Sequence, residues 1–304
     1  YSMAKGAVQC NMFDSYMADE GSYRLVGVPQ PWGGLLVLAR ESIVYTNPTR
    51  KARVILAVPS MCVSSALPLD AGAQGDALCR VLLLDEDGGV HVLLLLSEAS
   101  SAGRRVTSMR LERLGATVSS MCAAYLDAGV VFVGAAHAHE RRVRLSSVRL
   151  PDGCFVRDLG WPHAGCPRGL DCGVLDAFAV DTDGRGQAAT VFAAVGSGRE
   201  GGLHVARRGA SFVPAAEHDL GVLGARVFAA GDALYASSPC GTRVLRVQDG
   251  CLEDAGDSCL ASPASESILV CESDAGVVQV TSGGVFCGKN HWTPPTGAFV
   301  TLAA

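Results

Sequence analysis

Residues 111–134 read LERLGATVSSMCAAYLDAGVVFVG and contain two apolar strands around the tight turn Leu126-Asp127-Ala128-Gly129. Tyr125 and the run 130–133 carry aromatic and β-branched side chains that favour a pleated, buried surface. Asp and Gly in the turn are residue types that allow a chain to reverse. The stretch therefore predicts a β-hairpin of the kind found in a propeller blade.

Short apolar runs of the same kind recur along the chain, separated by clusters of Gly, Asp, Pro and Ser. Almost no segment sustains the period of an amphipathic helix. We expect hairpins that pair 35–38 with 43–45, 81–84 with 90–95, 118–125 with 129–133, 190–195 with 203–206, and 234–236 with 243–247. Neighbouring hairpins begin roughly 40 to 60 residues apart, the spacing of four-stranded blades. The sequence predicts an all-β protein with β-propeller architecture.

Composition indicates a folded protein without the charge pattern of a nucleic-acid binder. The 304 residues are 49% hydrophobic and 18% charged, which supplies enough apolar surface for a core. The 25 basic residues are scattered and outnumbered by 30 acidic ones, so direct, charge-driven binding to DNA or RNA is disfavoured. The apolar run 81–96 is interrupted by Asp85, Glu86 and Asp87, which excludes a membrane-spanning helix there.

The twelve cysteines show neither metal-site nor disulfide spacing, since none forms a Cys-x-x-Cys pair. Cys79, Cys122 and Cys271 lie inside apolar, strand-like runs, where a reduced thiol acts as a small buried hydrophobe. Asn47 precedes Pro48 and so forms no glycosylation site, and the N-terminus does not resemble a signal peptide. We therefore expect a reducing, intracellular compartment, and we expect the chain to be a fragment of a longer protein.

Five phrases of the sequence together resemble one known family. They are VPQPWGG at 28–34, ESIVY at 41–45, LLDEDG at 83–88, YLDAGVVFVG at 125–134 and GLHVARRG at 202–209. In this order they resemble the first β-propeller of the superfamily that contains DNA damage-binding protein 1, the large propeller subunit of splicing factor three-b and the 160-kilodalton subunit of the cleavage and polyadenylation factor. The phrase at 125–134 is most similar to the DNA damage-binding branch.

The resemblance implies a particular domain organisation. Residues 1–22 would form an irregular leader, and residues 23–226 the C-terminal blades of the first, seven-bladed propeller. Residues 227–304, where the similarity is weaker, would contribute the opening strands of a second propeller. The chain would then be the back half of one propeller running into the next.

Three patterns suggest catalytic or cofactor chemistry, and each has a simpler interpretation. Residues 196–201 fit Gly-x-Gly-x-x-Gly, but alternation in 203–207 predicts a further strand instead of the required helix, so the pattern is typical of a hairpin loop. His137 and His139 would share one face of a strand and could bind a metal, yet the resemblance implies an exposed loop without metal. We predict no cofactor and no metal.

Carboxylates occur in two clusters, Asp85 to Asp87 and Asp181 with Asp183, and paired carboxylates hydrolyse glycosides in some propellers. Solvated acidic turns are the simpler interpretation, and no serine lies in a nucleophile-elbow motif. We therefore predict a protein that is not an enzyme, and a hydrolase that uses Asp85 or Asp181 is the alternative of another class.

The resemblance implies a partner-binding surface instead. In the DNA damage-binding branch, two propellers form a cleft that grips helical segments of substrate receptors. The matching positions are Tyr125, Asp127 and Ala128, where the family has Asn at the last, the loop residues Ala136 and His137, and the apolar pair Val174 and Leu175. Tyr125 would be an aromatic anchor with its hydroxyl available to a partner, although packing between blades would explain the same residues.

The implied function is that of a non-catalytic adaptor in a nuclear, and partly cytoplasmic, cullin-4 RING ubiquitin ligase. Its partners would be the cullin scaffold and helical segments of receptor proteins, with DNA contacted indirectly through a receptor, and without a membrane or a small-molecule substrate. Such an adaptor raises the effective concentration of substrate near the ubiquitin-loaded enzyme. The alternative from the same superfamily is an RNA-processing scaffold in splicing or 3′-end cleavage.

Overall fold

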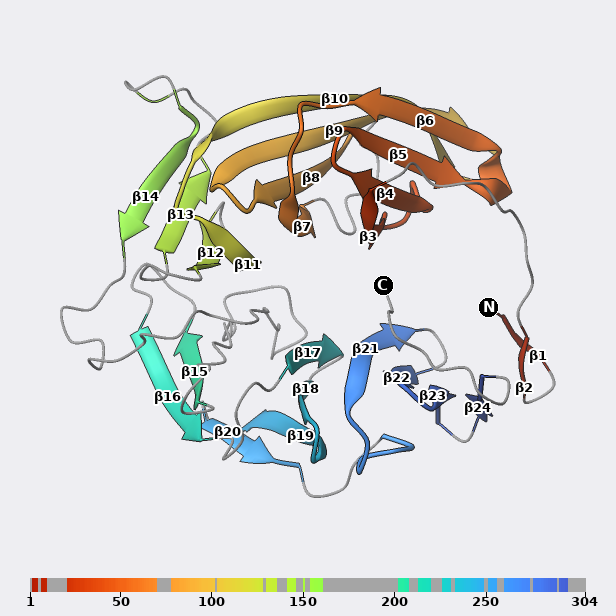
Figure 1. Ribbon diagram of the computed structural model, residues 1–304, viewed down its shortest axis with the longest axis vertical. Helices are drawn as coiled ribbons and strands as arrows, with labels where there is room; N and C mark the ends of the chain where they lie inside the picture. The colour runs from red at the N-terminus through yellow and green to blue at the C-terminus, as the bar shows by residue number, and fades with distance from the viewer. Residues whose placement is uncertain are drawn as a thin grey trace. The chain divides into compact units, whose positions relative to one another are not determined.

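The computed structural model describes residues 2–4, 7–9, 21–69, 78–101, 103–127, 130–135, 141–145, 150, 154–160, 202–207, 213–219, 226–230, 233–248, 251–255, 260–273, 276–288 and 290–294. Within these ranges the regular structure consists of antiparallel strands and one 3₁₀ turn, η1, at Pro48–Arg50, and no α-helix occurs (Figure 1). The predicted all-β class is therefore confirmed. The chain divides into two compact units, which are described separately.

One unit comprises Met12–Tyr125 and Gly129–Leu159, with Ala304. It holds three four-stranded sheets in which each strand pairs with its neighbour along the chain. The first sheet contains β3 (Ser22–Gly27), β4 (Leu35–Ala39), β5 (Ser42–Asn47) and β6 (Ala52–Ala57). The second contains β7 (Val63–Pro68), β8 (Leu78–Asp85), β9 (Gly89–Ser100) and β10 (Gly103–Ala116), and the third β11 (Ser120–Asp127), β12 (Val130–Ala135), β13 (Arg141–Leu145) and β14 (Val156–Gly160).

The other unit comprises Tyr1–Asn11, Leu126–Ala128 and Gly160–Ala303. It holds two further four-stranded antiparallel sheets and two strand pairs. The sheets are β17 (Arg226–Ala230), β18 (Ala233–Ser238), β19 (Gly241–Gln248) and β20 (Cys251–Asp254), followed by β21 (Ser267–Ser273), β22 (Gly276–Thr281), β23 (Gly284–Cys287) and β24 (Asn290–Trp292). The pairs are β1 (Ser2–Ala4) with β2 (Ala7–Gln9), and β15 (Gly202–Arg207) with β16 (Val213–Asp219).

Four of the five predicted hairpins are confirmed. Leu38 pairs with Ile43 in β4 and β5, Leu84 with Val90 in β8 and β9, and Leu234 with Leu245 in β18 and β19. β11 and β12 are neighbours in their sheet, as the 111–134 stretch predicts. The fifth hairpin includes residues 190–195, which lie outside the described residues, as does the 196–201 loop. The described partner of its other strand, β15, is β16.

Burial on both faces explains why β8 is a continuous apolar run instead of an alternating one. Val81 and Leu83 belong to a cluster with residues of β4 and β5, such as Leu36 and Tyr45. The intervening Leu82 and Leu84 belong to a second cluster with residues of β11 and β12. The β8 sheet is therefore covered by another sheet on each face, as a blade is in a propeller.

Hydroxyl and amide groups join the two four-stranded sheets of the other unit. The hydroxyl of Thr242 on β19 lies 3.0 Å from Ser237 Oγ and 2.7 Å from Ser267 Oγ on β21. Gln279 on β22 donates its amide to Ser267 Oγ at 2.9 Å. All four side chains are buried, so the network satisfies polar groups that would otherwise destabilise the interior.

The predicted domain division stays a prediction. Strands β1 and β2 lie within the range expected to form an irregular leader. β17 begins at Arg226, next to the predicted boundary, and opens a new four-stranded sheet.

Candidate protein-interaction surface

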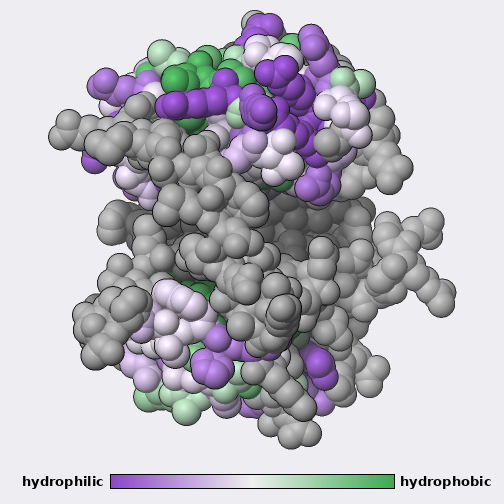
Figure 2. All heavy atoms as spheres, turned by 90° about the vertical axis from the view of Figure 1, so that its right-hand side faces the viewer, coloured by the Kyte–Doolittle hydropathy of each residue, from purple (hydrophilic) through white to green (hydrophobic). Residues whose placement is uncertain are grey.

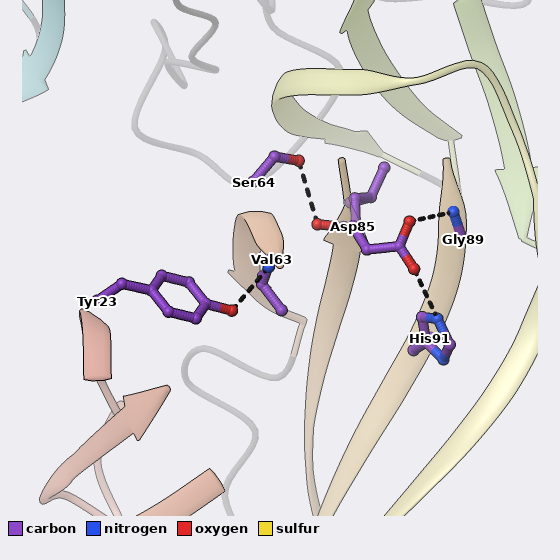
Figure 3. Close-up of polar contacts among 7 residues, drawn as sticks. Tyr23, Val63, Ser64, Asp85, Gly89 and His91 are labelled. Atoms are coloured by element: carbon purple, nitrogen blue, oxygen red, sulfur yellow. Dashed lines mark hydrogen bonds and ion pairs between the residues drawn. The ribbon is translucent and has the colours of Figure 1, made fainter. Parts of the chain in front are cut away.

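The acidic turn between β8 and β9 is held by its own first residue (Figure 3). One carboxylate oxygen of Asp85, Oδ1, accepts a hydrogen bond from the Gly89 N–H at 2.6 Å, and Oδ2 lies 3.2 Å from His91 Nε2. The Gly88 N–H donates to the Asp85 carbonyl at 3.0 Å, and the Gly88 carbonyl accepts from the Thr117 N–H at 2.7 Å. The turn is thus fixed both internally and to the chain that follows β10.

This geometry corrects the expectation of a fully solvated acidic turn. Glu86 and Asp87 are exposed as predicted, but the side chains of Asp85 and His91 are only 15% and 16% exposed. Both Asp85 oxygens already have partners within the protein. Asp85 therefore acts as a turn-holding group, and Asp181, the other carboxylate suggested for a hydrolase, lies outside the described residues.

Side chains of the first strands link the three sheets of this unit. The Val63 N–H at the start of β7 donates to the Tyr23 hydroxyl oxygen on β3 at 2.7 Å (Figure 3). The next residue, Ser64, donates to the Leu84 carbonyl at 3.1 Å and lies 2.9 Å, Oγ to Oγ, from Ser120 on β11. Partial burial raises the pKa of Tyr23 above its usual value of 10.0. These contacts join the first sheet to the second and the second sheet to the third.

The loop between β3 and β4 provides a second link, which was not predicted from the sequence. Trp32, at the centre of the PQPWGG phrase, is fully buried, and its indole N–H donates to Ser97 Oγ on β9 at 3.0 Å. The Arg50 guanidinium donates to the carbonyls of Pro31, Trp32 and Arg104. An isolated Trp between prolines and glycines was the available signal, because a large side chain in a turn-rich segment needs a buried site.

The structure describes little of the predicted partner-binding residues. Tyr125 and Asp127 lie on β11, where the backbone is described but these side chains are not. Ala128, Ala136, His137, Val174 and Leu175 lie outside the described residues, as does His139. This surface therefore stays a prediction.

The described part of the chain also bears on metal sites, disulfides and membrane-spanning helices. There, no three His, Cys, Asp or Glu side chains group as metal ligands. The seven cysteines whose side chains are described form no disulfide with one another. Cys79 and Cys122 are buried as expected, whereas Cys271 is only partly buried. The same residues include no helix of the length and apolar character needed to cross a membrane.

Comparison with known proteins extends this description. Residues 7–161 match the model of the RSE1/DDB1/CPSF1 first beta-propeller. Similar curated proteins include DNA damage-binding protein 1 of Oryza sativa subsp. japonica, 32% identical over 192 residues, and that of Drosophila melanogaster, 32% identical over 185 residues. DNA damage-binding protein 1a of Arabidopsis thaliana is 30% identical over 192 residues.

The aligned segments cover 63%, 61% and 63% of this chain and 16%, 15% and 16% of these relatives, respectively. The chain thus corresponds to a small part of the relatives' length. The match includes the three sheets whose first strands are joined by Tyr23, Ser64 and Ser120. By its sequence and its antiparallel four-stranded sheets, the chain belongs to the RSE1/DDB1/CPSF1 first β-propeller family.

Proposed function

We propose that this chain serves as part of a non-catalytic adaptor in a cullin-4 RING ubiquitin ligase, where it links substrate receptors to the cullin and contributes to DNA damage recognition and repair. Its partners are helical segments of receptor proteins and the cullin scaffold, and it meets DNA through a receptor. It works in the nucleus, and to a lesser extent in the cytoplasm.

The observation that carries this proposal is the similarity, over more than half of the chain, to proteins named DNA damage-binding protein 1. The interlocked sheets suit the task, because an adaptor must hold two partners at a fixed separation to raise their effective concentration. The net charge of −5 agrees with indirect contact to DNA, since a phosphate backbone attracts basic surfaces.

A scaffold for splicing or 3′-end cleavage is the second candidate, because one family model spans these branches. Affinity purification of the tagged chain from nuclear extract, with quantitative mass spectrometry, distinguishes them. The adaptor proposal expects cullin-4 and receptor proteins to be enriched over a tag-only control. Enrichment of splicing or polyadenylation factors without a cullin would contradict it and favour the second candidate.

A further inference from the structure

A pocket of about 670 Å³ lies between the first and second sheets of the unit that contains β3 to β14. Its size lies within the usual range for sites that hold small ligands or side chains of a partner. Three segments line it: the end of β6 with the following loop, the β8–β9 turn, and β10. The lining residues are Leu56–Met61, Asp85, Asp87, Gly89, His91, Met109, Arg110, Leu111, Arg113 and Ala116.

The apolar part of this lining comes from both sheets. Leu56, Val58 and Met61 contribute from the first sheet and its connection, and Met109 and Leu111 from β10. Met61 and Leu111 are only partly buried, so apolar surface remains available to another molecule. Met61 is the partly exposed methionine of this lining, and a methionine adapts readily to side chains of different shape. The pocket is therefore suited to an apolar side chain of a partner.

Some charged side chains of the pocket already have partners within the protein, and others do not. The carboxylate of Asp85 accepts a hydrogen bond from the Gly89 N–H and contacts His91, and Arg110 forms an ion pair with Glu112 at 2.9 Å. Arg113 is exposed, and no acidic side chain in the described part of the chain pairs with it. Arg113 thus offers an unmatched positive charge on the β10 side of the pocket, whereas exposed Asp87 offers a negative charge at the turn.

From this arrangement we infer that the pocket binds a linear peptide segment of a partner protein, in which an apolar residue is flanked by an acidic one. The apolar side chain enters between Met61 and Leu111, and the acidic side chain pairs with Arg113. Asp87 disfavours an acidic residue at the opposite end, so the two charges set the direction of the peptide. The fixed Asp85–Gly89 turn keeps this wall of the pocket in place before binding, which limits the entropy cost of association.

This site is separate from the surface predicted around Tyr125. Ser119 donates to the Glu86 carbonyl at 2.5 Å, so β11 begins beside the β8–β9 turn and the pocket. Tyr125 lies toward the other end of the same strand. The inference does not depend on the adaptor proposal, and a scaffold of either branch could carry this second docking site.

A displayed library of random peptides of about 12 residues tests the inference. The complete 304-residue chain serves as bait, and the Arg113→Glu variant serves for counter-selection. We expect enrichment of peptides with Leu, Met or Phe next to Asp or Glu. The best synthetic peptide should bind Arg113→Glu about tenfold more weakly, and replacement of its acidic residue by Lys should restore binding to that variant.

Arg105→Glu is the matched control, because Arg105 lies on the same strand, is exposed and does not line the pocket. It should leave the affinity unchanged. If Arg113→Glu lowers the melting temperature, Arg113→Gln replaces it, with a smaller loss of affinity expected. Enrichment of basic peptides, no enrichment over the counter-selection, or equal effects of the Arg105 and Arg113 variants would overturn the inference.

Discussion

The indole Nε1 of Trp32 and the hydroxyl of Ser97, 65 residues apart in the chain, form a buried hydrogen bond of 3.0 Å between two sheets. Trp32 belongs to the loop after β3, and Ser97 to β9 of the next sheet. The tip of the β9–β10 hairpin is held to the same loop, since the Arg104 N–H donates to the Pro31 carbonyl at 3.1 Å. A loop without regular structure is therefore a principal connection between neighbouring blades.

Ser97→Ala should lower the free energy of unfolding by about 1 to 3 kcal/mol, because the buried indole N–H of Trp32 would lose its partner. Trp32→Phe should cost more, since it also removes buried volume. Urea denaturation of both variants and of the double variant measures the coupling between the residues. Strictly additive effects would contradict a direct interaction.

Gly89→Ala should destabilise the β8–β9 turn. A Cβ at this position would overlap with Asp85 Oδ2 and lie 2.8 Å from His91 Nε2, so the carboxylate would have to leave its partners. We expect a loss of about 1 to 3 kcal/mol in thermal or urea unfolding. Gly27→Ala is the control, because nothing lies within 4 Å of its Cβ position. Equal stability of the two variants would show that the Asp85 contacts contribute little.

Several features of the fold could be predicted from the sequence, and others could not. The β4–β5 and β8–β9 hairpins were predictable because their runs of Leu, Val and Ile end at short polar turns. The role of Asp85 was not, since an acidic turn has the same composition whether its carboxylate faces water or accepts the Gly89 N–H. Trp32 and Ser97 could not be paired either, because contacts across so many residues leave no local pattern.

The same distinction applies to the candidate sites. Family resemblance alone predicts a role for Tyr125, and the sequence does not distinguish Arg113 from the other scattered arginines. Only the placement of β10 beside the β6–β7 connection brings Arg113, Met61 and Leu111 to one pocket.

Thr242→Val should weaken the sheets formed by β17 to β24. The substitution conserves shape but removes a buried hydroxyl that lies within hydrogen-bond distance of Ser237, Ser267 and the Ser265 carbonyl. We expect a loss of about 1 to 3 kcal/mol in the free energy of unfolding. Thr107→Val, at an exposed position of β10, is the control and should change stability little. A neutral Thr242→Val variant would argue against the network.

Alkaline pH should destabilise the protein through Tyr45. Burial raises the pKa of this tyrosine above its usual value of 10.0. The stabilisation of the folded state by the protonated Tyr45 side chain is therefore fully present below the unfolded-state pKa. It is lost as the pH rises through the higher folded-state pKa. Tyr45→Phe should be less stable at neutral pH, because the hydroxyl no longer donates to the Gly33 carbonyl at 2.8 Å. When the pH rises from about 9 to about 11, the free energy of unfolding of Tyr45→Phe should fall less than that of the wild type.

The comparison of Tyr45→Phe with the wild type isolates this residue, because Tyr23, Cys62 and Cys271, whose pKa values are also raised, are present in both proteins. Denaturant midpoints measured across this pH range provide the test. Parallel stability curves for the two proteins would contradict the proposed role of Tyr45.

The central claim, that the chain is a receptor-binding scaffold, is tested most directly at Tyr125. Quantitative mass spectrometry of proteins recovered with the wild type, Tyr125→Ala and Tyr125→Phe measures receptor binding. We predict that Tyr125→Ala weakens it by about 1 to 3 kcal/mol without a lower melting temperature. Receptor binding by Tyr125→Phe should lie between that of the wild type and that of Tyr125→Ala, because the variant retains the ring and loses the hydroxyl. Unchanged receptor recovery with a lower melting temperature would contradict the claim and make Tyr125 a packing residue.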